Sequence, residues 1–460
     1  MFGFARAPLT FTLLASMKFP PASLLVSLLV WMAQEPAHGE VRLPAVLGSH
    51  SVLQQGMPLP IWGWADPGEK VLVHLDEQNV PAQADAKGAW RVTLKPLHAD
   101  GKTHQLTVTG KNTVISDDLL IGEVWLGSGQ SNMAYGLGKD AETLAAGAPL
   151  IRFLQVPQNL SRTPAKDVQA EWKPLTVETG AGFSAVLAHF GKRLNEELKV
   201  PIGLINSSRG STAIEQFMPP PAPGPLYNGS VGPLAPVAIR GLLWYQGEAN
   251  VQMGHGAAYY EKLKTMIEGW RRVWGADFPV YLVQLAPLAN YAPDTLPPVW
   301  EARMAALKLP KVGLVSTIDL AGNMRSIHPS NKKDVGLRLA LWALARDYGR
   351  KDIAYASPFY KAMAVEGKSI RLTFTHTAGG LKSKDGKPLS EFEIAGADGV
   401  FVPAEAAVEK ETIVVHSAEV PSPCMVRFAW SNAPTPNLVN AAGLPAMPFH
   451  TDHWTGGTGE

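Results

Sequence analysis

The sequence has a single cysteine, Cys424, in 460 residues. One cysteine excludes an intrachain disulfide framework and any CxxC metal site, and it is ordinarily a small buried apolar residue. An excess of charge of either sign is also absent, because 41 Lys and Arg balance 40 Asp and Glu to a formal net charge of +1. Nucleic acids and anionic membranes attract clustered basic residues, so neither is an expected partner.

Metal and nucleotide motifs are missing as well. The sequence contains no HExxH, P-loop or dinucleotide fingerprint, and the scattered histidines, including His450 and His453, lack the spacing of metal ligands. We therefore expect no metal and no cofactor. The content of 46% hydrophobic and 18% charged residues is that of a folded globular protein, long enough for two or three cores.

Residues 1–39 have the pattern of an export signal. Met17-Lys18 is a short positive region, Leu24 to Met32 is apolar, and Ala37-His38-Gly39 is a small-x-small cleavage site. Met17 is an alternative start of translation. We expect a secreted protein, periplasmic in a Gram-negative source, that begins near Glu40 and has no membrane contact after cleavage. No later stretch is apolar enough to span a bilayer.

Three segments with different periodicity follow the signal. Residues 40–115 consist of short alternating runs between Pro and Gly turns, which predicts a β-rich domain. Residues 116–350 alternate apolar strands, at 119–126, 151–156, 201–206, 238–245, 279–286 and 312–318, with helices at 184–198, 259–274 and 331–348. This alternation predicts an α/β domain with a doubly wound parallel sheet and helices on both faces. Residues 351–460 return to a β-rich, sandwich-like pattern, and this segment either packs with residues 40–115 or stands separately.

One serine follows the first strand of the α/β segment. The run from Ile121 ends in Gly127-Ser-Gly129-Gln-Ser131-Asn-Met133, where glycines permit a tight turn. The carboxyl end of a buried strand is where open α/β sheets bind their ligands. A serine there is a candidate nucleophile, provided that a base and oxyanion donors surround it. The last glycine of a G-x-S-x-G elbow is missing, which counts against an α/β-hydrolase.

Two further motifs lie downstream. Gly241 to Asn250 reads as an apolar strand that ends in Trp-Tyr-Gln246-Gly-Glu248-Ala-Asn250, and Ile327-His328-Pro-Ser-Asn-Lys332 precedes a predicted helix. With GQSNM, these motifs resemble the sialate O-acetylesterase-like family of carbohydrate esterases, a branch of the SGNH (GDSL-type) hydrolases. The resemblance covers nearly the whole chain after the signal. It implies an SGNH-type sheet with Ser131 as nucleophile and His328 as base.

The third member of the triad departs from the family pattern. Relatives usually carry an aspartate two residues before the histidine, where this sequence has Ser326. A triad needs an acceptor for the histidine Nδ1–H, and Asp319 is the nearest upstream acid. Ser326, Glu248 or a backbone carbonyl are alternatives, and so is a Ser–His dyad.

The resemblance also suggests oxyanion and substrate residues. The Ser131 amide and Gly210, which matches the second glycine block, are candidate donors, and the side-chain amides of Gln246 and Asn250 match the third block. Alternatively, these two amides tie neighbouring strands together. Arg209 stands where relatives often have tryptophan, so the pocket wall beside it differs.

Glu248 and two aromatic residues have open roles. The Glu248 carboxylate orders the Ser131 loop, pairs with Arg240 or binds a sugar hydroxyl. Tyr227 and Trp300 lie in loop-like stretches, where they either pack in the core or stack on a sugar.

Hydrolysis of O-acetyl esters on a carbohydrate is the predicted function. Sialic acid would need an arginine for its carboxylate, such as Arg209 or Arg325, whereas acetylated xylan or xyloglucan would need aromatic platforms. The alternative is a non-catalytic carbohydrate-binding protein on a degraded esterase scaffold. The sequence does not specify the oligomeric state.

Overall fold

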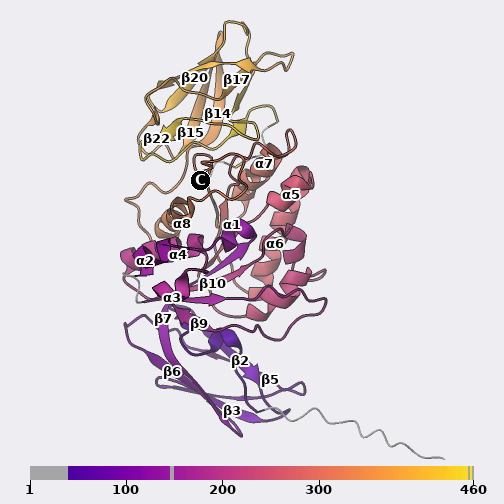
Figure 1. Cartoon of the computed structure of the whole chain (residues 1–460), viewed down its shortest axis with the longest axis vertical. Helices are drawn as coiled ribbons and strands as arrows, with labels where there is room; N and C mark the ends of the chain where they lie inside the picture. Colours follow the sequence, from indigo (N-terminus) through magenta and orange to yellow (C-terminus); the bar gives the residue numbers. More distant parts are fainter. Residues whose placement is uncertain (1–39, 146–149, 454–455, 458–460) are drawn as a thin grey trace, which may run out of the picture. The chain divides into compact units, whose positions relative to one another are not determined.

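The computed structural model describes residues 40–145, 150–453 and 456–457 (Figure 1). The predicted signal, residues 1–39, lies outside the described residues. The described chain has a mixed α/β centre with a mostly parallel sheet and β-rich segments before and after it, as the sequence predicts.

The N-terminal β-rich segment begins with six short strands: β1 (Val52–Gln54), β2 (Leu59–Trp64), β3 (Lys70–Leu75), β4 (Gln78–Gln83), β5 (Ala89–Leu94) and β6 (His104–Thr109). Strand β2 pairs with β5, and β3 pairs with β4 and β6, all antiparallel. Side chains of β3 and β5 alternate between exposed and buried, as expected when one face of a sheet is solvated.

Strand β7 (Thr113–Gly129) joins this segment to the central sheet. Its first part pairs with β6, and its second part pairs in parallel with β10 (Ile202–Ser208) and β11 (Gly241–Tyr245). Strand β1 also pairs in parallel with β7. The predicted domain boundary at residues 115–116 therefore falls inside one continuous strand.

The central sheet has the strand order β13-β12-β11-β7-β10-β8-β9. Its other strands are β8 (Ile151–Gln155), β9 (Trp172–Pro174), β12 (Val280–Val283) and β13 (Val312–Val315), and only β9 is antiparallel to its neighbour. Every residue of β10 to β13 is buried, as in parallel sheets covered on both faces. Strands β8 and β10 lie on one side of β7, and the later strands β11 to β13 lie on the other side. The strand order therefore reverses at β7, which is the point where open α/β sheets bind their ligands.

Eight α-helices are found in the described residues: α1 (Ser131–Ala134), α2 (Asp140–Ala145), α3 (Val177–Gly180), α4 (Ala185–Leu198), α5 (Glu248–Gln252), α6 (Gly256–Trp274), α7 (Pro297–Ala305) and α8 (Lys332–Arg346). Helices α4 and α8 pack on each other, α4 over β8 and β10 and α8 over β12 and β13. Ser184 caps α4, Gly275 ends α6 with a φ of 63°, and Asn331 caps α8. These ends agree with the predicted helices to within about three residues, the usual uncertainty of helix boundaries.

The C-terminal segment contains two four-stranded antiparallel sheets and one two-stranded sheet. The first sheet is β14 (Phe359–Glu366), β15 (Ser369–Thr375), β20 (Thr412–His416) and β19 (Glu405–Glu409). The second is β18 (Val402–Pro403), β17 (Phe392–Ala395), β21 (Met425–Phe428) and β23 (Phe449–His450), and β16 (Leu381–Ser383) pairs with β22 (Leu438–Asn440).

The apolar residues gather in two clusters. One is continuous from the N-terminal strands through the central sheet, and the other consists almost entirely of C-terminal residues such as Ile370, Ile413 and Phe428. Among the described strands, none of the N-terminal segment pairs with one of the C-terminal segment.

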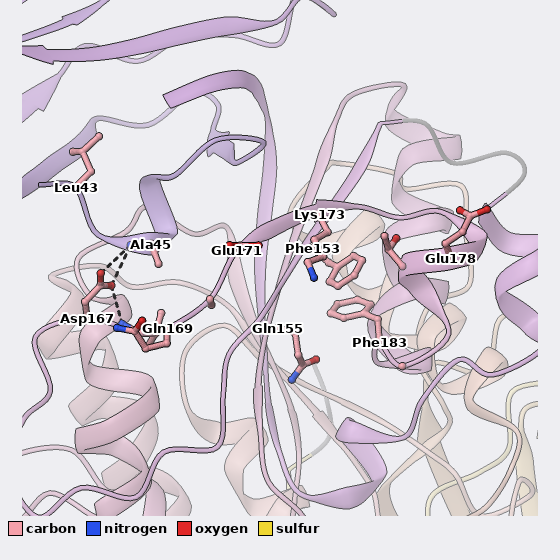
Figure 2. Close-up of a pocket in the computed structure, with 14 residues that line it drawn as sticks. Leu43, Ala45, Phe153, Gln155, Asp167, Gln169, Glu171, Lys173, Glu178 and Phe183 are labelled. Atoms are coloured by element: carbon pink, nitrogen blue, oxygen red, sulfur yellow. Dashed lines mark hydrogen bonds between the residues drawn. The ribbon is translucent and has the colours of Figure 1, made fainter. Parts of the chain in front are cut away.

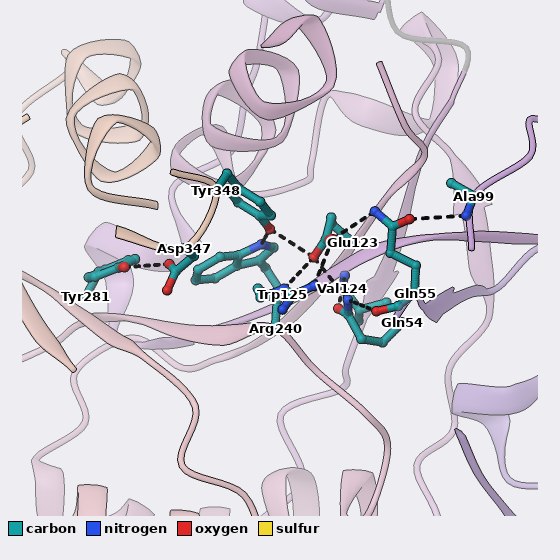
Figure 3. A network of polar contacts seen from close by, with 10 residues as sticks. All are labelled: Gln54, Gln55, Ala99, Glu123, Val124, Trp125, Arg240, Tyr281, Asp347 and Tyr348. Carbon is teal, nitrogen blue, oxygen red and sulfur yellow. Dashed lines mark hydrogen bonds and ion pairs between the residues drawn. The ribbon is translucent and has the colours of Figure 1, made fainter. Parts of the chain in front are cut away.

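A buried carboxylate joins the N-terminal strands to the centre (Figure 3). Glu123 on β7 is 2% exposed and accepts hydrogen bonds from Gln54 at 3.0 Å, Gln55 at 2.9 Å, Arg240 at 2.7 Å and Tyr348 at 2.9 Å. A buried charge is tolerated when it is paired and fully hydrogen-bonded, as here. The N-terminal segment is therefore part of the core of the central sheet.

Candidate active site

The turn after β7 places Ser131 at the carboxyl edge of the central sheet. Gly129 has a φ of +137°, and a Cβ at this position would lie 2.1 Å from the backbone oxygen of Tyr245. Only glycine fits such a close approach. The Gln130 amide then donates to the same Tyr245 oxygen at 2.9 Å, and Ser131 begins α1. The sequence Gly-x-Ser therefore projects the hydroxyl between the ends of β10 and β11.

The structure brings Ser131 and His328 together. His328 Nε2 lies 2.8 Å from Ser131 Oγ, although the two residues are 197 positions apart in the chain. Ser131 is partly buried, and His328 is exposed in the loop before α8. A neutral imidazole at this distance can accept the hydroxyl proton, which is the arrangement of a nucleophile and its base.

Ser326, which stands at the family's aspartate position, contacts the backbone of His328. Its Oγ accepts from the His328 amide at 3.3 Å and donates to the His328 carbonyl at 3.2 Å. Within the described chain no protein group accepts a hydrogen bond from His328 Nδ1. Ser326 thus orders the loop, while the ring has no carboxylate partner.

Asp319, the predicted orienting acid, is engaged elsewhere. Both of its oxygens accept hydrogen bonds from Arg338 on α8, at 2.7 and 2.8 Å, and Lys384 lies 3.5 Å away. Burial favours the neutral acid, but the hydrogen bonds and charge of Arg338 hold the pKa of Asp319 below its usual value. No hydrogen bond joins Asp319 to His328 in the described chain. The structure therefore places Asp319 in a structural ion pair and gives no support to its predicted role.

Gly210 lies beside the serine. A Cβ added to it would be 3.6 Å from Ser131 Cβ, and the neighbouring Arg209 amide donates to the Gly129 carbonyl at 2.9 Å. The amide of Gly210 has no hydrogen-bond acceptor among the described residues. It remains a candidate oxyanion donor. The Arg209 side chain has no hydrogen-bond or ion-pair partner among the residues that the structure describes.

Gln246 and Asn250 are buried and bonded to neighbouring loops. The Gln246 amide nitrogen donates to the Thr212 carbonyl at 3.0 Å and to Asn250 Oδ1 at 2.8 Å, and the Asn250 amide nitrogen donates to Glu215 at 3.0 Å. These contacts fit the interpretation in which the two amides tie strand ends together. Neither amide has a hydrogen bond to Ser131.

Glu248 connects to both loops of the candidate site through Asn132. Asn132 Nδ2 donates to Glu248 Oε1 and, at 3.0 Å, to the Ile327 carbonyl, while Lys332 Nζ donates to Asn132 Oδ1 at 2.6 Å. Of the three interpretations of Glu248, these contacts favour the one in which its carboxylate orders the Ser131 loop. It does not pair with Arg240, whose partner is Glu123.

Sequence reasoning missed Asn132 and Lys332 as functional residues. Asn132 is 2% exposed and Lys332 is also 2% exposed, which is rare for a lysine unless it is paired. Burial lowers the pKa of Lys332 to about 8, and Glu248 opposes this shift. The available signal was their position inside the GQSNM and IHP-x-N-K motifs, where Asn132 follows Ser131 directly and Lys332 lies four residues after His328.

Tyr227 and Trp300, for which core packing and sugar stacking were the two alternatives, are both in the core. Tyr227 is 5% exposed and Trp300 is fully buried, with its indole nitrogen bonded to the Leu285 carbonyl at 2.8 Å. Instead, Tyr135, four residues after Ser131, is 37% exposed, and the Lys332 ammonium lies 5.0 Å from its ring centroid. Tyr135 is the aromatic surface nearest to the nucleophile in sequence.

A cavity borders the candidate site, whereas a larger hollow does not. The smaller cavity, of about 390 Å³, is lined by Gln252, Asn290, Tyr291, Arg325 and Ile327, so it borders the loop that carries His328. A larger hollow of about 860 Å³ is lined by residues such as Phe153, Asp167 and Phe183 and includes no candidate site residue (Figure 2). The smaller cavity reaches the histidine loop through Arg325 and Ile327, although neither Ser131 nor His328 lines it.

Within the described residues, no group of three or more His, Cys, Asp or Glu side chains is arranged to hold a metal ion. In that same part of the chain no helix is long and apolar enough to cross a membrane.

The chain is similar to known carbohydrate esterases in sequence and in structure. Residues 121–344 match the family model of the carbohydrate esterase, sialic acid-specific acetylesterase. A solved carbohydrate acetylesterase from Xanthomonas citri is 35% identical, with a TM-score of 0.85 over 90% of this chain and 100% of that one. Sialate O-acetylesterases from Homo sapiens and Pongo abelii are each 27% identical over 93% of this chain and 95% of theirs.

The fold and these similarities define the chain as an esterase enzyme built on a central parallel sheet. It belongs to the sialate O-acetylesterase-like family of carbohydrate esterases. The alternative of a non-catalytic carbohydrate-binding protein has no support from these similarities.

Proposed function

We propose that this protein hydrolyses O-acetyl esters of a carbohydrate with Ser131 as the nucleophile and His328 as the general base. The observation that carries the proposal is the distance of 2.8 Å between Ser131 Oγ and His328 Nε2. The strand order, with the serine at the end of β7 between two parallel neighbours, fits the doubly wound SGNH arrangement that we propose for the catalytic segment.

In the first half-reaction, His328 Nε2 takes the proton of Ser131 as Oγ attacks the acetyl carbonyl carbon. The amides of Gly210 and Ser131 are the proposed donors to the developing oxyanion. The tetrahedral intermediate collapses when the sugar oxygen leaves and takes the proton from His328. In the second half-reaction, His328 deprotonates a water that attacks the acetyl-enzyme, and acetate leaves as Ser131 regains its proton.

We propose that the pair works as a dyad, because Asp319 is occupied by Arg338 and Ser326 bonds only the His328 backbone. The loop that carries the histidine then has to fix the ring without a carboxylate.

The sugar enters from the side of the smaller cavity in this proposal. Arg325 lines that cavity and carries a guanidinium that suits an acidic sugar such as sialic acid, while the exposed ring of Tyr135 suits a neutral acetylated polysaccharide. We favour the neutral substrate class, xylan or xyloglucan, because the protein is proposed to be exported. N-terminal sequencing of the exported protein should give a start near Glu40, and an intact Met1 or Met17 would contradict export by a cleaved signal.

The experiment measures the release of p-nitrophenol from p-nitrophenyl acetate and from p-nitrophenyl esters of longer acyl chains. Both the wild type and Ser131→Ala are assayed. Loss of the nucleophile should lower kcat about 10⁶-fold, while the melting temperature stays unchanged because the side chain is small. The wild type should prefer acetyl over longer chains. Wild-type turnover by a folded Ser131→Ala protein would place the catalytic site elsewhere. A screen of acetylated sialic acid, xylan and xyloglucan then decides between the two substrate classes.

A further inference from the structure

His328 lies in a loop that must be held in place against Ser131. Its ring is exposed and has no carboxylate partner within the described chain, yet Nε2 lies 2.8 Å from Ser131 Oγ. The residues between Leu320 and Asn331 form no helix or strand. A general base must be held within hydrogen-bonding reach of the proton it takes. Something other than an acid must therefore fix this loop against the nucleophile.

The side chain of Asn132, directly after Ser131, contacts the loop on both sides of His328. Its Nδ2 donates to the carbonyl of Ile327, one residue before the histidine, at 3.0 Å. Its Oδ1 accepts from Nζ of Lys332, four residues after the histidine, at 2.6 Å. The loop is thus fastened at two points to the residue next to the nucleophile.

Glu248 fixes the orientation of this amide. The second hydrogen of Asn132 Nδ2 goes to Glu248 Oε1 at the start of α5. If the amide were flipped, its NH₂ group would face the Lys332 ammonium, and its oxygen would face the carboxylate and the Ile327 carbonyl. Both contacts would be repulsive, so a single orientation is compatible with all three partners.

The charges of Glu248 and Lys332 balance each other across the amide. Glu248 is 3% exposed and Lys332 is 2% exposed, so either charge alone would be costly to bury. The rings of Tyr135 and Tyr245 lie 5.0 and 5.5 Å from the ammonium and add cation–π attraction. The two side chains therefore hold the amide of Asn132 between opposite charges.

We infer that Asn132, Glu248 and Lys332 form a buried clamp that positions His328 against Ser131, in place of the carboxylate that would otherwise orient the histidine. The three are positioning residues, since none of them contacts the Ser131 hydroxyl or the imidazole. This inference rests on the proposed function. It gives the lysine of the IHP-x-N-K motif and the asparagine of GQSNM one shared role, which is to hold the histidine loop.

The test removes the lysine contact. Lys332→Met keeps the length and apolar stem of the side chain but gives Asn132 Oδ1 no donor. A displacement of about 1 Å at a catalytic group costs on the order of 10²-fold in rate. We expect kcat to fall about 10- to 100-fold by this displacement, with KM within about twofold because the substrate contacts are untouched.

A second variant separates positioning from stability. Lys332→Met removes a positive charge that faces the buried Glu248 across Asn132, so its melting temperature should also fall. The double variant Lys332→Met/Glu248→Gln is neutral and keeps an acceptor for Asn132, and it should regain most of the melting temperature but not kcat. It also serves if the single variant does not fold. Recovery of kcat together with melting temperature would mean that the lysine acts only on stability and would overturn the inference.

The matched control is Tyr348→Phe, which removes a buried hydrogen bond to Glu123, away from the Ser–His pair. Its melting temperature should fall while kcat remains at the wild-type level. The rate at which a fluorophosphonate labels Ser131 gives a readout that needs no sugar substrate. If the wild type labels rapidly but releases no acetate, the proposed function fails, and labelling of the variants still tests the clamp. If Lys332→Met is labelled and turns over substrate at the wild-type rates, the inference that the clamp positions His328 is overturned.

Discussion

At the scale of single residues, the candidate site combines a serine and a histidine in contact with side chains that link the surrounding loops. Ser131 and His328 are close enough for proton transfer, whereas Gln246, Asn250 and Glu248 are used in hydrogen bonds between loops. Polar residues in a catalytic motif therefore fall into two groups. Those that are buried and hydrogen-bonded to other loops hold the site together, and those that are exposed are available to a substrate.

Asp319 provides the first prediction at this scale. Asp319→Asn should lower kcat by less than about tenfold, because the carboxylate bonds Arg338 and not His328. A true orienting acid would cost about 10⁴-fold. The melting temperature should fall, since Arg338 loses the charge that compensates it in a half-buried site.

Steady-state acetate release and thermal unfolding of Asp319→Asn check this expectation. Ser326→Asp is the companion variant, because it restores the acid at the family's position, two residues before the histidine. A 10⁴-fold loss in a folded Asp319→Asn protein would show that the carboxylate reaches His328 during turnover and would contradict the dyad.

At the scale of elements, the polar side chains of the candidate site lie at or near the ends of helices and strands. The site forms where β7, β10 and β11 end and where α8 begins, since parallel strands bring their carboxyl ends to one edge. The other end of α8 has a partly buried acid, Asp347, whose Oδ2 accepts a hydrogen bond from Tyr281 on β12 at 2.5 Å. This contact joins the helix to the sheet (Figure 3).

Asp347 predicts a pH-dependent stability. Burial raises the pKa of Asp347 from 3.8 to about 6, although the Tyr281 hydrogen bond opposes the shift. The folded state therefore favours the neutral acid, and this contribution to stability is full below about pH 4 and is lost as the pH rises through about 6. Asp347→Asn keeps an acceptor for Tyr281 without the charge. It should be more stable than the wild type at pH 7 by up to about 3 kcal/mol, and the difference should vanish near pH 4.

Denaturant unfolding of the wild type and Asp347→Asn between pH 4 and pH 7.5 measures this difference. Glu261→Gln, which changes an exposed carboxylate on α6, is the control and should show no comparable trend. A stability difference for Asp347→Asn that is constant over this pH range would contradict the titration of Asp347.

At the scale of the whole described chain, the N-terminal strands share a core with the catalytic segment. Strand β7 belongs to both, β1 pairs with it in parallel, and Gln54 and Gln55 donate to the buried Glu123. The C-terminal sheets have an apolar cluster of their own. The two β-rich segments therefore differ in how closely they depend on the central sheet.

A truncation tests this dependence. A chain of residues 116–460 lacks β1 and β6, two of the four strands that pair with β7, and exposes the apolar residues that they cover. It should therefore be insoluble or lack a cooperative unfolding transition. Residues 40–460 should fold and unfold cooperatively. Expression, circular dichroism and thermal unfolding of both chains provide the measurement. A soluble, cooperatively folding 116–460 chain would show instead that residues 40–115 are an independent domain.

The sequence alone determined the class of the fold and located Ser131 and His328, which the structure brings into contact. Alternating and helical periodicities are properties of neighbouring residues, so all six predicted strands of the central sheet and the helices at 184–198, 259–274 and 331–348 are present, with shifted ends. The glycine turn at Ser131 and the cap before α8 are also local, and short motifs located them. The resemblance carried by the motifs then identified the family.

Only the tertiary structure decided which polar side chains meet. Asp319 is the acid nearest to His328 upstream in sequence, but the packing of α8 gives it Arg338 as a partner. Asn132 meets Ile327 and Lys332, 195 and 200 positions away, and no local pattern encodes such a contact. Tyr227 and Trp300 lie in loop-like sequence yet are buried because other elements cover them. Periodicity depends on neighbouring residues, whereas burial and hydrogen-bond partners depend on segments that only folding brings together.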